Sequence, residues 1–154
     1  MNKVKRNPAL LYLGRFQADY LADGATQSIK FPFKAEIVRD LEVINTATLS
    51  EQIKAWVAQY KIVPADLTIL LADDLLFSKV ITVPDPKSRE DAINTFIDAV
   101  PFEETGVVQV PFQGSIAVSV ANKSYYDAFK KAFEALGFSI VLVLPAFLLN
   151  KEIN

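Results

Sequence analysis

The sequence contains neither cysteine nor histidine among its 154 residues. These two absences exclude thiol nucleophiles, zinc sites built from cysteine and histidine, and haem ligation through an imidazole. They also exclude every catalytic triad or dyad that uses an imidazole. The chemistry that remains open to the chain is carried by carboxylates, hydroxyls, lysines and arginines.

Glycine is scarce as well, because the five glycines stand singly at positions 14, 24, 106, 114 and 137. The Rossmann and P-loop phosphate sites both need closely spaced glycines, so that the backbone can approach a phosphate group. Nucleotide binding therefore has no local support in the sequence.

Long hydrophobic runs are absent too. The longest run, residues 140–149, is interrupted by Pro145 and is about half the length of a membrane-spanning helix. The basic residues 1–6 are followed only by the short apolar run 8–13, which is too brief for a signal peptide. We therefore expect a cytoplasmic chain with no membrane span of its own.

The charge is nearly balanced, with 16 Lys and Arg against 18 Asp and Glu, which gives a net charge of −2. This balance gives no reason to expect a nucleic acid or an anionic membrane as a partner. The hydrophobic content of 51% and the aromatic content of 11% are typical of an ordered globular domain. We expect residues 1–154 to form a single compact body.

Period-two patterns and short apolar runs predict most of the strands. They lie at residues 10–13, 18–22, 26–33, 67–72, 75–83, 107–112, 115–121 and 138–144. Asp23-Gly24 and Gln113-Gly114 are hairpin turns between neighbouring strands. Residues 35–44 are ambiguous between an irregular connection and a short strand at 39–43.

Three helices are predicted from apolar residues at helical spacing. The first begins at Thr48, which forms a capping box with Glu51, and stops near Lys61. The second begins at the N-cap Ser88 and is closed by Pro101. The third is capped at residues 122–124 and ends at Gly137, and the tail 146–154 adds part of a helix or frays. The resulting mixture of strands and helices is an α/β or α+β fold.

Several side chains invite a chemical interpretation, and each has a plainer one. Paired carboxylates at 73–74 and 103–104 could bind a cation or act as general acid and base. The first pair suits a turn, and the second suits a solvated turn or the N-terminal end of a short helical segment. Trp56 and Tyr60 lie one helical turn apart and are interpreted as core packing rather than a stacking platform. The basic residues Lys3, Lys5 and Arg6 form either a solubilising end or a contact for acidic partners. No catalytic, cofactor-binding or metal-binding residue is predicted.

The order of elements from residue 67 to 144 resembles the small insertion subdomain of the actin-like proteins that build pilus and secretion platforms. These are PilM of type IV pili and the cytoplasmic part of GspL of type II secretion, with FtsA as a more distant relative. The resemblance rests on the strand pair before Pro84, on Val100-Pro101-Phe102-Glu103-Glu104 after a helix, and on Ala135-Leu136-Gly137-Phe138 before the last strand.

Upstream, residues 10–14 are similar to the first strand of actin-like domains, which reads Asp-x-Gly-Ser/Thr. Here Tyr12 takes the place of the Asp, Gly14 is kept, and Arg15-Phe16-Gln17 replace the small hydroxyl-bearing loop. The phosphate site of the family is thus degenerate, and 154 residues are too few for the second lobe that closes over ATP. We therefore expect neither nucleotide binding nor ATPase activity.

The resemblance implies a partial actin-like (ribonuclease H-like) architecture. Residues 1–66 would be part of the N-terminal actin-like lobe, 67–145 an insertion-type subdomain of ββαββαβ type, and 146–154 a tail. It also implies a noncatalytic scaffold at the inner face of the cell membrane. Its partners would be an inner-membrane assembly protein or the N-terminal domain of the assembly ATPase. The edge strand 26–33 could accept an extended peptide.

Two other functions remain open at this point. The chain could be an actin-like nucleotide binder with a shortened but working site. It could also be an unrelated enzyme that uses carboxylates alone, such as a glycosidase with two acids. The hydrophobic segment before residues 151–154 leads us to expect a piece of a longer protein that is anchored to the membrane.

Overall fold

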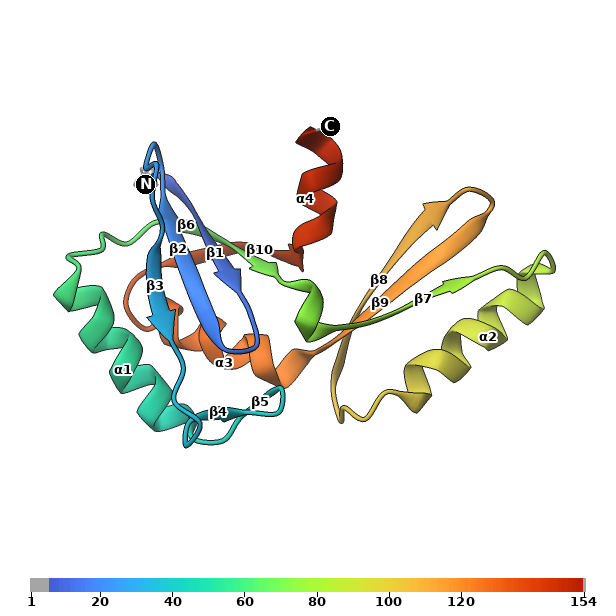
Figure 1. The fold of residues 1–154 in the computed structure, drawn as a ribbon, viewed down its shortest axis with the longest axis horizontal. Helices are drawn as coiled ribbons and strands as arrows, with labels where there is room; N and C mark the ends of the chain where they lie inside the picture. The colour runs from blue at the N-terminus through green and yellow to red at the C-terminus, as the bar shows by residue number, and fades with distance from the viewer. Residues whose placement is uncertain (1–5, 154) are drawn as a thin grey trace, which may run out of the picture.

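A computed structural model describes residues 6–153. Within them the larger sheet has five strands: β1 (Pro8–Leu13), β2 (Gln17–Ala22), β3 (Ile29–Pro32), β6 (Asp66–Leu71) and β10 (Ser139–Pro145). Their order is β10-β6-β1-β2-β3 (Figure 1). β1, β2 and β3 are antiparallel neighbours, whereas β6 and β10 run parallel to β1. The predicted mixed α/β class is confirmed.

Helices α1 (Thr46–Gln59) and α3 (Lys123–Glu134) cover one face of this sheet. Because side chains alternate along a strand, Leu11, Leu67 and Ile69 all face these helices and are fully buried. They pack against Phe129 and Phe133 of α3, which are also buried. Burial of this apolar face is the main source of stability for the larger part of the molecule.

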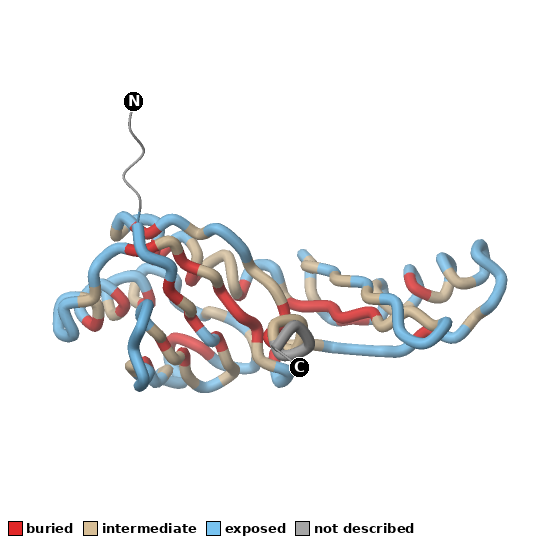
Figure 2. Tube along the Cα trace, turned by 90° about the horizontal axis from the view of Figure 1, so that it is seen from above, coloured by how far each residue is buried: buried red, intermediate tan, exposed pale blue. Residues whose placement is uncertain are grey.

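The second sheet has three antiparallel strands, β7 (Leu76–Ile81), β8 (Thr105–Phe112) and β9 (Ser115–Asn122), in the order β7-β9-β8. Helix α2 (Pro86–Ala99) packs on one of its faces. Helix α2 and this sheet together form a separate hydrophobic cluster around Ile81, Ile93, Val118 and Val120. Figure 2 shows the two buried regions along the long axis of the molecule.

The remaining described elements are short. The 3-10 helix η1 (Asp73–Leu75) links β6 to β7, and helix α4 (Ala146–Ile153) follows β10. The ambiguous stretch 35–44 contains a small hairpin of β4 (Val38–Arg39) and β5 (Glu42–Val43). No helix among residues 6–153 has both the length and the apolar character needed to cross a bilayer.

The division between the sheets differs from the predicted boundaries. β6 and β10 were predicted within a subdomain at 67–145, but both lie in the larger sheet, where β6 pairs with β1 and β10 pairs with β6. The smaller unit is therefore a βαββ insertion between residues 76 and 122, not a ββαββαβ subdomain. Hydrogen bonds between β1 and β6 join residues about 58 positions apart, for example Leu11 and Ile69, and local sequence patterns cannot report such a pairing.

Two predicted helix starts are wrong by three residues. The N-cap of α1 is Asn45, whose side chain accepts a hydrogen bond from the Thr48 amide at 3.0 Å. The N-cap of α2 is Asp85, which accepts from the Ser88 amide at 2.9 Å. The predicted caps were thus the residues that donate to the true ones. The third start, at Asn122, is confirmed.

Candidate partner-docking site

The acidic pairs that the sequence singled out lie on the surface. Asp73 and Asp74 are exposed in η1, which confirms their interpretation as a connection between strands. Glu103 and Glu104 are exposed in the segment between α2 and β8. Glu103 lines a hollow of about 380 Å³ together with Glu42. Among the described residues, no three Asp or Glu side chains gather in a way that could hold a metal ion.

Trp56 is a core residue, as predicted. Its side chain is 5% exposed, and its indole N–H donates to the Lys30 carbonyl at 3.0 Å. Its ring meets the ring of Tyr20 edge-on at 6.1 Å. Tyr60 packs on the outer side of Trp56 at 6.2 Å and is about half exposed. The hydrogen bond to Lys30 ties α1 to β3, so the tryptophan serves packing rather than stacking of a ligand.

The turn and the basic cluster also have clear positions. Gly24 has a φ of 75°, so the turn Asp23-Gly24 is confirmed where a glycine is favoured. Arg6 donates a hydrogen bond to the Gly137 carbonyl. Lys3 and Lys5, the other members of the basic cluster, lie outside the described residues.

The connection between β1 and β2 corresponds to the degenerate phosphate loop. The Gly14 amide donates to the Gln17 carbonyl at 2.9 Å, so it is not available to a phosphate. Arg15 lies over the ring of Phe16 at 5.6 Å and 3.8 Å from the Asp40 carboxylate. Residues 14–17 offer no hydroxyl side chain. This loop therefore lacks both a free Gly14 amide and the hydroxyl side chain of the actin-like sequence pattern.

Tyr125 of α3 is hydrogen-bonded to the β1–β2 loop. Its hydroxyl donates to the Gly14 carbonyl at 2.8 Å, and its side chain is 3% exposed. Burial raises the pKa of the Tyr125 hydroxyl well above its usual range, and the nearby Asp74 charge raises it further. The hydroxyl consequently stays protonated and remains a hydrogen-bond donor. It anchors the β1–β2 loop to α3 and to the junction of the two sheets.

The three-stranded sheet has one face that α2 does not cover, which we call the open face. Alternation along the paired strands assigns eleven residues to it: Leu76, Ser78, Val80, Gly106, Val108, Val110, Phe112, Ser115, Ala117, Ser119 and Ala121. None of these residues is charged. Val80 is 50% exposed, so the outer part of the face is in contact with solvent.

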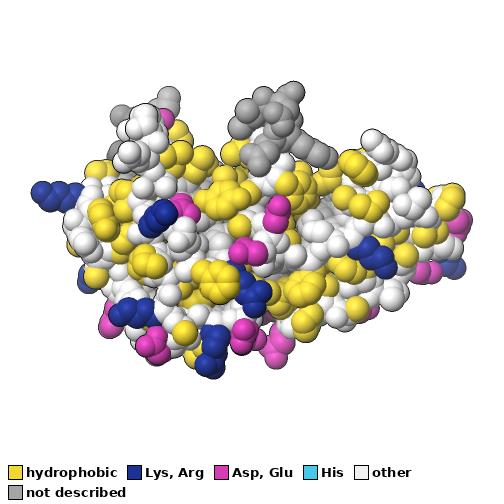
Figure 3. All heavy atoms as spheres, viewed as in Figure 1, with side chains coloured by type: hydrophobic (Ala, Val, Ile, Leu, Met, Phe, Trp, Pro, Cys, Tyr) yellow, Lys and Arg dark blue, Asp and Glu magenta, His cyan; other side chains and the backbone are white. Residues whose placement is uncertain are grey.

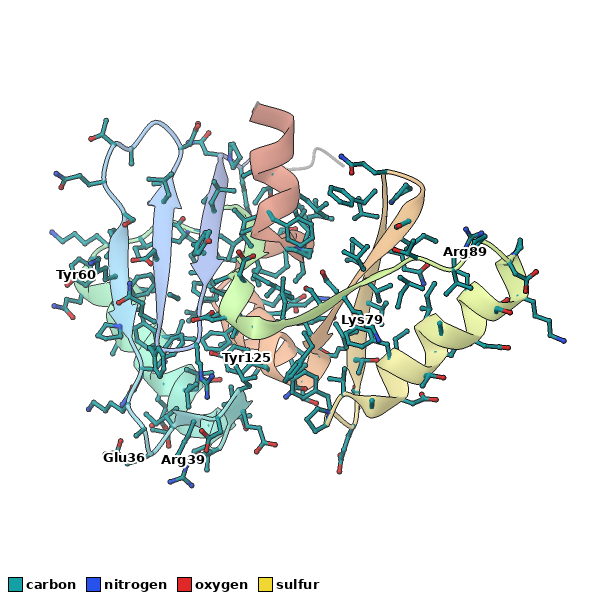
Figure 4. The ribbon with its side chains drawn as sticks, turned by 45° about the vertical axis from the view of Figure 1, so that its right-hand side comes forward. Glu36, Arg39, Tyr60, Lys79, Arg89 and Tyr125 are labelled. Atoms are coloured by element: carbon teal, nitrogen blue, oxygen red, sulfur yellow. The ribbon has the colours of Figure 1, made fainter. Side chains whose placement is uncertain are left out.

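The charged residues of β7 and α2 lie elsewhere. Lys79 points to the face that α2 covers, since its neighbours Ser78 and Val80 point to the open face. Figure 4 shows Lys79 and Arg89 on the α2 side of the small sheet. The smaller unit does carry charged side chains, but strand alternation places Lys79 on the α2 side and leaves the open face uncharged.

The open face leads into a groove of about 200 Å³ between the two sheets. Val108, Ser119 and Gly106 line one side, and Val143 and Pro145 of β10 line the other. Tyr126 of α3 lies directly against Gly106, so even a methyl group at position 106 would collide with its hydroxyl. Figure 3 shows hydrophobic side chains gathered over this middle region of the molecule.

The groove is smaller than the 300–1,000 Å³ of typical small-molecule sites. It has room for about one apolar side chain of a partner. An uncharged sheet face beside such a pocket is typical of protein–protein contacts, in which a few buried anchor side chains carry most of the binding energy.

The predicted peptide-binding edge at β3 is less suitable. β3 is an edge strand, as expected from Pro32, but it spans only Ile29–Pro32. The Lys30 carbonyl already accepts the Trp56 indole N–H, and Pro32 has no amide hydrogen to donate. Two of the backbone groups that an added strand would need are thus missing from this edge.

No known protein family and no curated protein sequence matches the chain. Solved structures do match it. The cytoplasmic domain of EpsL, an inner membrane component of the type II secretion system of Vibrio cholerae, superposes with a TM-score of 0.55 at 16% identity. The match covers 90% of this chain and 57% of that one.

A PilM-PilN type IV pilus biogenesis complex superposes with a TM-score of 0.60 at 15% identity, covering 92% of this chain and 48% of that one. A Bacteroides thetaiotaomicron protein with an actin-like ATPase fold and unknown function gives a TM-score of 0.49 at 10% identity, with 91% and 52% covered. This chain thus spans about half the length of these structures. The first two are of the kinds that the sequence resemblance named, so the fold it implied is confirmed.

Proposed function

We propose that this chain is a noncatalytic docking domain of a bacterial inner-membrane assembly platform of the type IV pilus or type II secretion kind. It acts on the cytoplasmic side of the membrane and binds a segment of a partner assembly protein. The observation that carries the proposal is the uncharged open face of the three-stranded sheet, which leads into the groove between the sheets.

The composition of the site supports this proposal. When a partner covers an uncharged surface, the desolvation penalty is small, because no charged group has to lose its hydration. Each Å² of apolar surface that is covered contributes about 25 cal/mol. Val80 and Val108 offer such surface on the open face, and the groove beside β10 accepts an anchoring side chain.

The similar structures support the same class of function. One of them is a complex of PilM with PilN, and the other is an inner membrane component of a secretion system. We infer that the partner of this chain is likewise an inner-membrane assembly protein, which presents a largely uncharged segment with at least one apolar anchor.

Nucleotide binding is the competing function, and a thermal-unfolding experiment separates the two. A ligand that binds the folded state raises the Tm in proportion to the logarithm of its concentration above Kd. We expect millimolar Mg-ATP to leave the Tm unchanged, because the Gly14 amide is already bonded to Gln17. A saturable rise in Tm that is specific to ATP would instead support a shortened actin-like site.

The docking proposal is tested by site-specific photo-crosslinking in the native host. A photoreactive amino acid is placed at Val108 on the open face, and a matched control carries it at Lys54 on the exposed side of α1. We expect the Val108 probe to capture an inner-membrane assembly protein and the Lys54 probe not to do so. Equal capture from both positions, or capture of no membrane protein from Val108, would refute the proposal.

A further inference from the structure

A second hollow, distant in sequence from the open face, lies where the larger sheet extends beyond the end of α1. We call it the terminal pocket. It measures about 720 Å³ and is lined by the start of β1, the end of β2, the start of β3 and the α1–β6 connection. This volume falls within the 300–1,000 Å³ range of small-molecule sites.

Small side chains on the sheet create the space. Ala9 and Ala22 are cross-strand partners on β1 and β2, and both line the pocket. Ile29 of β3 and Ile62 and Pro64 of the α1–β6 connection complete an apolar wall. Larger side chains at these two positions would fill the pocket, whereas the two alanines leave it open.

One buried polar group opens into this pocket. Tyr20 lines it and is only 2% exposed, and its hydroxyl has no hydrogen-bond partner among residues 6–153. Tyrosine hydroxyls that are buried to this extent normally have a partner. Every fully enclosed polar side-chain atom of the described residues does have one. The Tyr20 oxygen must therefore reach the space of the pocket.

The Tyr20 ring is held in place by its neighbours. It meets the rings of Trp56 at 6.1 Å and Phe138 at 6.4 Å, both edge-on. Burial raises the pKa of the Tyr20 hydroxyl, so it remains protonated at neutral pH. The pocket thus contains a fixed hydrogen-bond donor at the bottom of an apolar chamber.

The rim of the pocket carries a surplus of positive charge. Among the described residues that line it, Arg6 and Lys61 are basic and Asp23 alone is acidic. Arg6 is fixed by its hydrogen bond to the Gly137 carbonyl. Lys61, with a φ of 53°, follows the half-exposed Tyr60, which is the C-cap of α1 and is labelled in Figure 4 at this end of the molecule.

We propose that the terminal pocket binds a small amphipathic carboxylate. Its apolar body is aromatic and lies against Ala9, Ala22 and Ile62, where the face of its ring accepts the Tyr20 hydroxyl hydrogen, and its carboxylate lies at the Lys61 and Arg6 rim. The site is separate from the open face and does not depend on the docking function proposed above. It combines the apolar walls and few polar groups that ligand sites share.

The test is an NMR titration of the full ¹⁵N-labelled chain with naphthylacetate as the probe. Its uncharged analogue, naphthylacetamide, has the same apolar body and serves as the comparison. We expect saturable amide shifts confined to the pocket lining at residues 60–65 and at Ile29 and Ala22, with the carboxylate binding more tightly than the amide. Shifts that do not saturate, or that map to the open face, would overturn the proposal.

Three variants and one control make the test specific. Lys61→Ala should weaken carboxylate binding about threefold to tenfold and leave the amide unaffected, while Lys54→Ala on the exposed side of α1 should change neither. Tyr20→Phe, which removes only the hydroxyl, should weaken both probes by a similar factor. Ala22→Trp should block both. Equal effects of Lys61→Ala and Lys54→Ala, or unchanged binding to Ala22→Trp, would contradict the assigned site.

Discussion

Among single residues, Tyr125 makes the contact that decides what the β1–β2 loop can do. It comes from α3, more than one hundred positions away in the sequence, and its hydroxyl donates to the Gly14 carbonyl at 2.8 Å. The loop amide of Gly14 is occupied within the same hairpin by the Gln17 carbonyl. Both polar groups of Gly14 therefore serve the fold.

Replacement of Tyr125 by phenylalanine should lower the free energy of unfolding by about 1 kcal/mol, the typical contribution of one such hydrogen bond. The loss stays moderate because Gly14 is only half-buried, so its carbonyl is not left in a fully enclosed site. Urea-induced unfolding measures the change. Tyr60→Phe is the control, since Tyr60 is about half exposed, and it should leave the urea midpoint unchanged.

The same tyrosine gives a pH dependence. The pKa of Tyr125 is raised in the folded state by burial and by Asp74, whereas in the unfolded chain a tyrosine titrates near 10. Above about pH 10 the unfolded state releases its proton first, so stability that is fully present below this pH is lost as the pH rises.

We expect the urea midpoint of the natural chain to fall between about pH 9 and pH 11, and that of Tyr125→Phe to fall less. A partial dependence should remain in the variant, because burial also raises the pKa of Tyr20 and Tyr126. An equal fall in both proteins would contradict the assignment of the raised pKa to Tyr125.

At the scale of elements, the helix starts show what sequence patterns can resolve. Thr48 with Glu51 has the spacing of a capping box, and Ser88 precedes acidic residues, but each site has a second capping residue three positions earlier. In the structure Asn45 and Asp85 take the caps, and Pro86 follows Asp85 at the first helical position. The presence of each helix was predictable, whereas the choice between two adjacent caps depends on the path of the preceding chain.

Asn45→Ala should therefore cost about 1 kcal/mol of stability through the loss of the α1 cap. Thr48→Ala should cost at most a few tenths of a kcal/mol, because its backbone amide, which is the donor to Asn45, is retained. Chemical unfolding of both variants compares them directly. A larger loss in Thr48→Ala than in Asn45→Ala would show that the capping box at Thr48 is the true start.

The strands show a second limit of sequence patterns. Alternation in residues 75–83 predicted β7 correctly, but it could not tell which of its two faces α2 would cover. The face with Ile81 is buried under α2, and the face with Val80 is the open face. The composition of the open face was therefore visible in the sequence, while its exposure follows only from the packing of α2.

For the whole molecule, the two hydrophobic clusters indicate two structural units, and one depends more on the other for its fold than the reverse. The larger cluster joins residues from both ends of the chain, whereas the smaller one is confined to residues 81–120. The smaller unit is inserted between β6 and α3 and so depends on the larger one for its ends. The larger unit depends less on the insertion.

Hydrogen exchange should reveal this asymmetry. Ile81→Ala, which empties part of the smaller cluster, should cost about 2–5 kcal/mol and speed amide exchange in residues 76–122 alone. Phe129→Ala, in the larger cluster, should cost about 3–5 kcal/mol and speed exchange throughout. Faster exchange in β1 and β6 of the Ile81→Ala variant would show instead that the chain unfolds as one unit.

The proposed docking role depends on the whole arrangement, since β10 of one sheet and the open face of the other form the groove together. The sequence resemblance led to the correct fold, although no family match supports it. It placed peptide binding at the edge strand β3, where Trp56 and Pro32 leave few free backbone groups. The groove is a property of two sheets that the sequence patterns did not place side by side.

The most direct test of the docking function is a binding titration with the partner segment that crosslinks at Val108. Val108→Asp places a charge on the open face, and Gln109→Asp places the same charge one residue further on, on the opposite face of β8. The account predicts at least a tenfold loss of affinity for Val108→Asp, corresponding to about 1.4 kcal/mol, and unchanged affinity for Gln109→Asp. Equal affinity of the two variants would contradict it.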